Sequence, residues 1–450
     1  MSLFNKFTLI FAGLLLFSAC EDFLELEPIS QIGDNGFYTN TSEVESAVLA
    51  IYDGMQSAVQ REFALTEMRS DNTRTRTSEG EWAQFETLNV DPTNGTLADY
   101  WASWYNVIFR ANTVLDNLEA VEDASTRSQF EGEARFARAM AHFNLVRLFG
   151  DVPLIDRVIF QSDTDAFARV SSDQVYAAIV SDLEAAAATL PTRTQIAEGR
   201  ATRGAANALL GKVFLTTGDY SKAQAALEDV IDSGNYQLVD DYRDVFYSER
   251  NDEIIFAIQF VDDNENDSQD FSLEMTALGR AAGINFATDN FIDALSEADS
   301  LRAAVLFDPE DMAAVGKYLT SSADAELGGN DWIVLRYADV LLMYAEAILA
   351  GGESTTDSEA LDAVNAVRDR AGLDDLDEVT KDNLLYERRI ELAFENQRFF
   401  DLIRFGVAQE VLSDFAAEEG FSFSPTDLLL PIPQREINVS QGQLSQNPGY

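Results

Sequence analysis

Residues 203–232 constrain the fold most tightly, because they carry the spacing of a two-helix repeat. Small residues occur at Gly211 and Ala223, and Phe214 and Leu227 supply larger side chains between them. This pattern is typical of a tetratricopeptide unit, in which small residues let two antiparallel helices approach closely. One such unit leaves an apolar face uncovered, so it must stack on further helices. We therefore expect a mostly α protein built on a scaffold of tetratricopeptide-like helix pairs.

A second helix pair is predicted at 336–371. Its two halves repeat apolar side chains at helical intervals, and Gly351 and Gly352 between them favour a turn. Other segments also place their apolar residues on one helical stripe, and we expect helices at 41–59, 99–121, 130–149, 171–190 and 384–403.

Three long stretches, at 61–96, 233–300 and 410–450, lack this helical pattern. They hold short β-like pieces, such as 253–260, among Asn, Asp, Ser and Gly. Loops of this length inside a compact domain are usually functional or poorly ordered. We therefore predict that the helical scaffold displays a loop-rich, irregular binding face with a few short β-strands.

The N-terminus predicts export. Lys6 precedes an almost wholly apolar run at 7–17, which is typical of a secretory signal and too short for a comfortable transmembrane helix. Two small residues then precede Cys20, the only cysteine, and this resembles a bacterial lipoprotein box in which Cys20 is lipidated. An ordinary signal peptide with a chance cysteine is the alternative. We predict a signal peptide at 1–19 and a single tethered body at 20–450.

Charge and composition exclude several classes of function. The 450 residues include 78 Asp and Glu against 31 Lys and Arg, a net charge of −47 that becomes −48 when Lys6 leaves with the signal. A nucleic-acid binder needs a concentrated basic surface, so we expect no nucleic-acid partner. One Cys and one His exclude a thiolate metal cluster and a His-pair metal site, and a Ser–His–Asp triad would have to use His142.

Four segments resemble, in order along the chain, the SusD/RagB family of surface glycan-binding lipoproteins. They are FEGEARFARAMAHFNLVRLFGDVPL at 130–154, LRYADVLLMYAEA at 335–347, ERRIELAFE at 387–395 followed by RFFDL at 398–402, and LPIP at 430–433 with NPGY at 447–450. The resemblance implies a protein that binds oligosaccharide or polysaccharide without catalysis and docks as a lid on a TonB-dependent SusC-like transporter. It also implies a lipid anchor at Cys20 in the outer membrane, with the body facing the cell exterior.

Arginines in these segments lie on helices that are otherwise rich in Ala and Leu. In so acidic a chain we predict that they form buried or part-buried ion pairs rather than contacts to an anionic sugar. The arginines are Arg135, Arg138, Arg147, Arg336, Arg388 and Arg389, and the predicted partners are Glu133, Glu346, Glu387, Glu391 and Asp401.

Sugar rings present C–H faces ringed by hydroxyls, so exposed aromatic rings and planar polar groups are the candidates for a glycan site. Trp82 lies in a polar segment and Trp332 follows a Gly-rich one, whereas Trp101 and Trp104 have the spacing of a helix core. A local anchor for Trp82 and a core position for Trp332 are the alternatives. The predicted glycan-binding set is Trp82, Trp332, Asp71, Asn72, Arg69, Phe271 and Phe286.

The acidic run at 262–267 has enough oxygen ligands to suggest Ca²⁺, but it lacks the spaced EF-hand pattern. A solvated loop is the favoured interpretation, so no cofactor is predicted and calcium remains the alternative.

The leading functional hypothesis is uptake of a neutral glycan, for example a laminarin-type β-glucan, because a polyanion would meet an adverse field from the acidic body. A cell-surface tetratricopeptide scaffold for protein partners is a second hypothesis. A glycoside hydrolase is a weaker third, because it needs a carboxylate pair at a defined separation and nothing singles one out. His142 lies among packed helical residues, so we predict a structural role for it.

Overall fold

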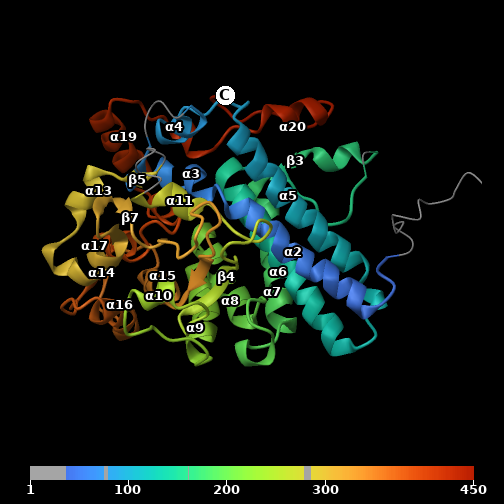
Figure 1. Ribbon diagram of the computed structural model, residues 1–450, viewed down its shortest axis with the longest axis horizontal. Coiled ribbons are helices and arrows are strands. Elements are labelled where there is room, and N and C mark those ends of the chain that lie inside the picture. Colours follow the sequence, from blue (N-terminus) through green and yellow to red (C-terminus); the bar gives the residue numbers. More distant parts are fainter. Residues whose placement is uncertain (1–36, 76–79, 161, 278–284) are drawn as a thin grey trace, which may run out of the picture.

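The computed structural model describes residues 37–75, 80–160, 162–277 and 285–450 (Figure 1). The predicted signal peptide at 1–19 and the lipidation site Cys20 lie outside these residues. The fold is mostly helical (57%), with a few short two-stranded sheets, as the sequence predicts.

Eight long helices form a continuous stack in which each packs on the next one along the chain (Figure 1). They are α2 (Thr41–Val59), α5 (Gly95–Asp116), α6 (Ala124–Phe149), α7 (Ser172–Thr189), α8 (Arg203–Thr217), α9 (Tyr220–Asp232), α15 (Tyr337–Leu349) and α16 (Ser358–Arg370). Shorter helices are α3 (Glu62–Leu65), α4 (Glu81–Glu86), α10 (Asp244–Tyr247), α11 (Phe271–Met275), α13 (Asp289–Ala294), α14 (Ser300–Leu306), α17 (Lys381–Glu391), α18 (Arg398–Arg404), α19 (Ala408–Glu419) and α20 (Gln434–Val439).

Helices α8 and α9 confirm the predicted repeat at 203–232. Thr202 and Asp219 cap the two N-termini by accepting hydrogen bonds from backbone N–H groups, and Gly218 ends α8 in a left-handed conformation. A Cβ at Gly211 would lie 2.6 Å from Leu227 of the facing helix, so only glycine allows this close approach. The second predicted pair is likewise present as α15 and α16.

One predicted helix is wrong. The sequence pattern indicates a single helix over 384–403, but the chain forms α17 and α18 with a turn between them. Phe394 and Asn396 in this turn adopt positive φ angles of 65° and 60°. The turn directs Glu395 back to Arg336, so a buried ion pair overrides the helical periodicity of the segment.

The strands form five antiparallel pairs among the described residues. The pairs are β1 (Thr73–Arg74) with β5 (Phe286–Ala287), β2 (Val152–Pro153) with β3 (Arg169–Val170), β4 (Ile254–Ile258) with β8 (Trp332–Arg336), β6 (Phe307–Asp308) with β7 (Asp311–Val315), and β9 (Ser354–Thr355) with β10 (Val379–Thr380). Strand β4 confirms the β-like piece predicted at 253–260. The β4–β8 pair contacts α8, and β4 also contacts α2, so a small sheet is held against the helical stack.

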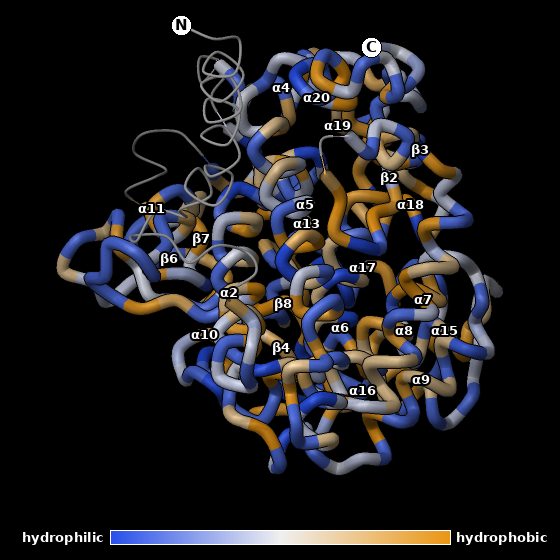
Figure 2. Tube along the Cα trace, turned by 90° about the vertical axis from the view of Figure 1, so that its right-hand side faces the viewer, coloured by the Kyte–Doolittle hydropathy of each residue, from blue (hydrophilic) through white to orange (hydrophobic). Residues whose placement is uncertain are grey.

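Two orthogonal views locate the ends of the molecule. Figure 2 shows β6 and β7 at one edge and α7, α8 and α9 on the opposite side. The C-terminus lies beside α4, α19 and α20 in both views (Figures 1 and 2). There the backbone N–H of Gln434 donates to the carbonyl of Pro92, which ties the last segment to the loop before α5.

A buried charge cluster lies beneath β4 and β8. Arg336 donates to Glu391 at 2.7 Å, to Glu395 at 2.7 Å and to Glu253 at 2.8 Å. Burial alone would raise the pKa of Glu391, but the surrounding arginines hold that pKa well below its ordinary range. The members of the cluster are Arg302, Lys317, Arg336, Arg370, Glu253, Glu387, Glu391 and Glu395.

The other family-segment arginines form ion pairs, as predicted, with one exception, but Arg135, Arg138 and Arg389 pair with acids outside the predicted set of partners. Arg388 pairs with Asp401 and Asp339, Arg138 and Arg135 pair with Asp182, and Arg389 pairs with Asp71. Arg147 is the exception, since its guanidinium lies between the rings of Phe143 and Phe400 at 4.1 and 3.9 Å and donates to the amide of Asn144. Stacking between two rings takes the place of a carboxylate partner.

Candidate functional site

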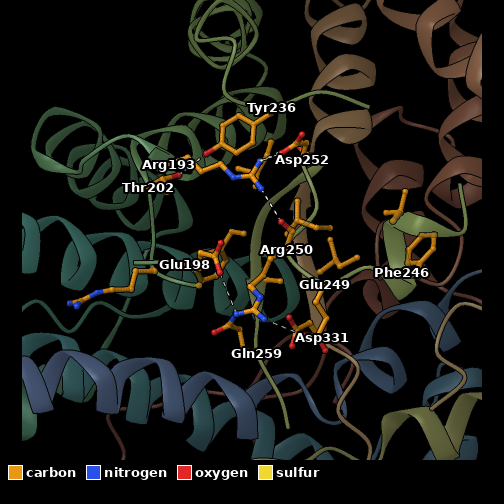
Figure 3. Close-up of a pocket in the computed structure, with 18 of the residues that line it drawn as sticks. Arg193, Glu198, Thr202, Tyr236, Phe246, Glu249, Arg250, Asp252, Gln259 and Asp331 are labelled. Carbon is orange, nitrogen blue, oxygen red and sulfur yellow. Dashed lines mark hydrogen bonds and ion pairs between the residues drawn. The ribbon is translucent and has the colours of Figure 1, made fainter. Parts of the chain in front are cut away.

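A cavity of about 960 Å³ opens where three irregular segments meet the β4–β8 pair (Figure 3). Its volume lies in the range of about 300–1,000 Å³ that is typical of small-molecule sites. We call it the polar cavity; its principal lining residues are Arg193, Glu198, Gly199, Arg200, Tyr236, Phe246, Glu249, Arg250, Asp252, Ala257, Gln259, Asp331 and Ile333.

Strand alternation decides which residues near β8 reach the polar cavity. Asp331 and Ile333 line it, whereas Trp332 between them points to the opposite side. The Trp332 ring is 3% exposed and packs on Tyr318 and Phe271 at 5.5 and 5.3 Å between ring centres. The prediction that Trp332 faces the ligand is therefore wrong, because its side chain lies on the face of β8 opposite to the polar cavity.

Arg193 shapes one wall of the polar cavity through backbone contacts. Its guanidinium donates to four backbone carbonyls, of residues 235, 250, 251 and 252, at 2.7 to 3.3 Å. It also lies 5.5 Å from the ring of Tyr236, whose hydroxyl hydrogen-bonds to Thr202. These hydrogen bonds use the guanidinium of Arg193, so the side chain holds the 235–252 segment in place; we call this contact the Arg193 brace.

Arg250 reaches into the polar cavity between Glu198 on one side and Glu249 and Asp331 on the other (Figure 3). Its nitrogens lie 3.4 Å from Glu198 and 3.8 Å from Glu249, and its side chain is 51% exposed. Exposed ion pairs of this kind contribute little to stability. Arg250 therefore spans the mouth of the cavity by contacts that a ligand can displace.

Asp331 is the titratable group most altered by the polar cavity. Burial raises its pKa to about 7, although its carboxylate accepts a hydrogen bond from the backbone N–H of Phe260 at 2.9 Å. Near neutral pH this carboxyl exchanges between an acceptor and a donor, and either form suits a sugar hydroxyl.

The charge balance of the polar cavity favours a neutral ligand. Its lining holds five carboxylates against three guanidinium groups. The third arginine, Arg200, is engaged by Glu133 at 2.8 Å and Glu45 at 3.0 Å. Part-buried Phe246 and Ile254 line the same cavity, and this mixture of apolar and polar groups matches the C–H faces and hydroxyls of a sugar.

The predicted polar residues of the glycan site are buried. Arg69, Asp71 and Asn72 are 2%, 3% and 0% exposed. Asp71 pairs with Arg398 at 2.8 Å and with Arg389 at 3.0 Å, which joins this segment to α17 and α18. The expectation that these three residues face a ligand is wrong, since acidic and basic side chains far apart in sequence meet here to hold the fold.

The predicted aromatic residues divide into two groups. Phe271 is fully buried against Trp332, so its predicted role in stacking is also wrong. Phe286 is part-buried, with Arg74 lying 5.2 Å from its ring. Trp82 is part-buried on Phe63 at 5.2 Å between ring centres, and Arg61 lies 5.7 Å from its ring. Both stay predictions, and both lie outside the lining of the polar cavity.

The acidic loop at 262–267 uses its side chains for loop contacts. Asp262 and Asp263 accept hydrogen bonds from Ser321 and Ser322, and Asp267 accepts one from Asn264. No group of three His, Cys, Asp or Glu side chains suited to a metal occurs among the described residues. Calcium binding stays untested, and this geometry lends it no support.

His142 has the predicted structural role. It is 3% exposed, and burial, with Arg138 nearby, lowers its pKa to about 4. Its Nδ1 lies 3.0 Å from the carbonyl oxygen of Arg138, and its Nε2 accepts a hydrogen bond from the backbone N–H of Ile155. Both ring nitrogens are thus occupied by backbone groups.

Comparison with known proteins finds similarity to SusD-type proteins in both the N-terminal and the C-terminal parts of the chain. Residues 311–450 match the profile of the SusD family, and residues 22–215 match a profile described as starch-binding and associating with the outer membrane. SusD-like protein P2 of Formosa agariphila is 27% identical, with 99% of this chain and all of the relative aligned. The starch-binding protein SusD of Bacteroides thetaiotaomicron is 24% identical over 76% of each chain.

A solved structure of a SusD-like protein is similar to this chain in both sequence and fold. A laminarin-binding SusD-like protein is 27% identical and superimposes with a TM-score of 0.78, covering 92% of this chain and all of that protein. Within the described residues, none of the helices combines the length and the apolar character needed to cross a membrane.

Proposed function

Because the chain belongs to the SusD/RagB family, we propose that it captures a neutral oligosaccharide or polysaccharide and delivers it to a TonB-dependent SusC-like transporter. Family membership confirms the resemblance found in the sequence and makes the chain a SusD-like surface glycan-binding protein of an outer-membrane-associated family, without catalytic activity. Beyond family membership, we propose that the glycan is neutral, that it binds in the polar cavity, and that it is passed to the transporter.

The polar cavity is the observation that carries the proposed site. Its five carboxylates and its amides present hydrogen-bonding groups at several points, and part-buried Phe246 and Ile254 supply apolar surface. Arg193 and Arg200 are engaged by backbone carbonyls and carboxylates, and Arg250 is flanked by Glu198 and Glu249, so a polyanion would meet more carboxylates than available cations in this lining. A neutral, hydroxyl-rich ligand satisfies these groups without a charge penalty.

A β-glucan of the laminarin type is the first candidate ligand. A solved relative with the same overall fold is a laminarin-binding protein, and this favours laminarin among neutral glycans. Delivery to a transporter and anchoring through Cys20 follow from the family and from the predicted lipoprotein box, which lies outside the described residues.

Native affinity electrophoresis tests this function. The wild-type protein is run in gels containing a neutral glucan such as laminarin or an anionic polysaccharide such as alginate. Ala257, on β4, lines the polar cavity, so the bulky ring of Ala257→Trp should obstruct it and remove retardation by the neutral glucan. Met312→Trp adds the same side chain at a position of β7 that is 56% exposed and is the matched control.

The expected result is retardation of the wild type and of Met312→Trp by a neutral glycan only. Retardation by anionic polysaccharides alone would contradict the proposed ligand class. Full retardation of a folded Ala257→Trp variant would move the site elsewhere, and Trp82→Ala in the same gels would then show whether the predicted Trp82 surface binds instead.

A further inference from the structure

A second hollow, of about 240 Å³, lies directly beside the polar cavity. The two share a wall made of Glu198, Gly199, Arg200, Ala257 and Gln259. Segment 198–200 therefore separates them, and we call it the divider.

Helix α2 supplies the far wall of the second hollow. Leu49, Tyr52, Asp53 and Gln56 line it, and their spacing places them on one face of the helix. Leu49 is 52% exposed, so an apolar surface stands beside a carboxylate and an amide. Such a combination can pack against a sugar C–H face and hydrogen-bond to its hydroxyls.

The polar groups of the second hollow retain capacity for a ligand. Asp53 pairs with Arg110 through one carboxylate oxygen, yet 60% of its side chain is exposed. Gln56 donates from its amide nitrogen to the carbonyl of Gln259 at 2.7 Å, which leaves the amide oxygen as an acceptor. The hydroxyl of Tyr52, by contrast, is already used by Glu133 and by the backbone N–H of Ala201.

The divider is held firmly at one end only. Arg200 is fixed by Glu133 and Glu45, whereas Glu198 is held by its exposed pair with Arg250. Gly199 has a φ of +83°, and a Cβ there would lie 2.3 Å from the amide oxygen of Gln259. The backbone therefore rests directly on the side chain of Gln259, and Gly199 adds no side chain of its own to the wall between the hollows.

We infer that the second hollow is a further sugar subsite, and that one glycan chain crosses the divider to occupy both hollows. This inference rests on the proposed function and specifies its ligand class as a neutral oligosaccharide of several residues. Contacts on the two sides of the divider belong to one ligand, so the second contact forms at high effective concentration. Short oligosaccharides reach only one hollow and bind more weakly.

Isothermal titration calorimetry with laminaritriose and laminarihexaose tests the inference. We expect the wild type to bind the hexaose about tenfold more tightly than the triose. The double variant Leu49→Ala/Asp53→Ala should weaken hexaose binding about fivefold and triose binding less than twofold. Leu301→Ala is the matched control, because Leu301 is 55% exposed and lies outside both hollows.

The outcomes separate the inference from the function on which it rests. Equal affinities for the two oligosaccharides, or an equal loss at both lengths in the double variant, would overturn the second subsite and leave the proposed function standing. If the folded wild type bound neither, the β-glucan assignment and the inference built on it would both be overturned. Thermal unfolding of the double variant should match that of the wild type, since both substituted side chains are more than half exposed.

Discussion

The buried charge cluster around Arg336 and the polar cavity around Arg250 are built from the same residue types, yet they have opposite properties. Arg336 is 1% exposed and donates to three carboxylates at 2.7 to 2.8 Å. Arg250 is half exposed, and its two carboxylate partners lie at 3.4 and 3.8 Å. Close hydrogen bonding around Arg336 makes the first region rigid, while loose pairing leaves the second open to exchange with a ligand.

This difference shows why acidic and basic residues alone do not identify the site. A buried ion pair is costly to break because the remaining charge has no water around it. An exposed pair is easily replaced by water or by a ligand. Three substitutions test this contrast between the two regions, and a fourth, at His142 on α6, tests a buried group outside both; they follow in decreasing order of the stability change that we expect.

Arg336→Met should destabilise the protein more than any other change proposed. It leaves Glu391, Glu395 and Glu253 buried with fewer partners, which we expect to cost about 3–5 kcal/mol of unfolding free energy. Urea denaturation followed by circular dichroism measures the loss. A loss below about 1 kcal/mol would mean that the buried charge cluster does not hold the fold.

His142→Gln should flatten the response of stability to acid. The pKa of His142 is lowered to about 4 in the folded state, so its contribution is fully present above about pH 6.5 and is lost as the pH falls toward 4. The wild type should lose about 3 kcal/mol through this group over that interval, and the variant should not. Urea denaturation at pH 7.5 and pH 4.5 measures the change in unfolding free energy of each protein. An equal loss in the wild type and the variant would contradict a buried neutral imidazole.

Asp331→Asn, in the polar cavity, should change stability at high rather than low pH, because burial raises the pKa of this carboxyl. The pKa of Asp331 is raised to about 7, so the carboxyl contributes most stability at low pH and loses it as the pH rises through 7. The variant should be more stable than the wild type at pH 8 by about 1 kcal/mol, since solvent in the open cavity screens part of the effect. No difference between pH 5 and pH 8 would argue against a raised pKa.

Arg250→Met should have the smallest effect on stability, below about 0.5 kcal/mol, because its ion pairs are exposed. Thermal unfolding measures this and provides the direct contrast with Arg336→Met. A loss comparable to that of Arg336→Met would remove the distinction between the two regions.

Helix pairing was predictable from the sequence because its determinants are local. Gly211 meets Leu227 within one repeat, and the spacing of these residues is visible in the chain itself. The ion-pair character of Arg336 and Arg388 was likewise predictable, because charged residues on apolar helices need partners. The break between α17 and α18 was not, since it depends on Glu395 reaching a strand distant in sequence.

The site was harder to predict than the scaffold. Trp332 was placed on the wrong side of β8 because the phase of a short strand is set by its pairing with β4. Asp331, the adjacent residue, was the better candidate, and its position one residue before a hydrophobic strand was the only local signal. The brace formed by Arg193 joins backbone carbonyls of a distant loop, and no sequence spacing encodes that contact.

Hydrogen–deuterium exchange with and without a saturating neutral glycan tests most directly whether the polar cavity is the binding site. We predict slower exchange in segments 196–202 and 249–260, with unchanged exchange at 69–72 and in α11, which lie outside the cavity. Protection confined to α4 around Trp82, with no change at 196–202, would contradict this account and assign the glycan to a different surface.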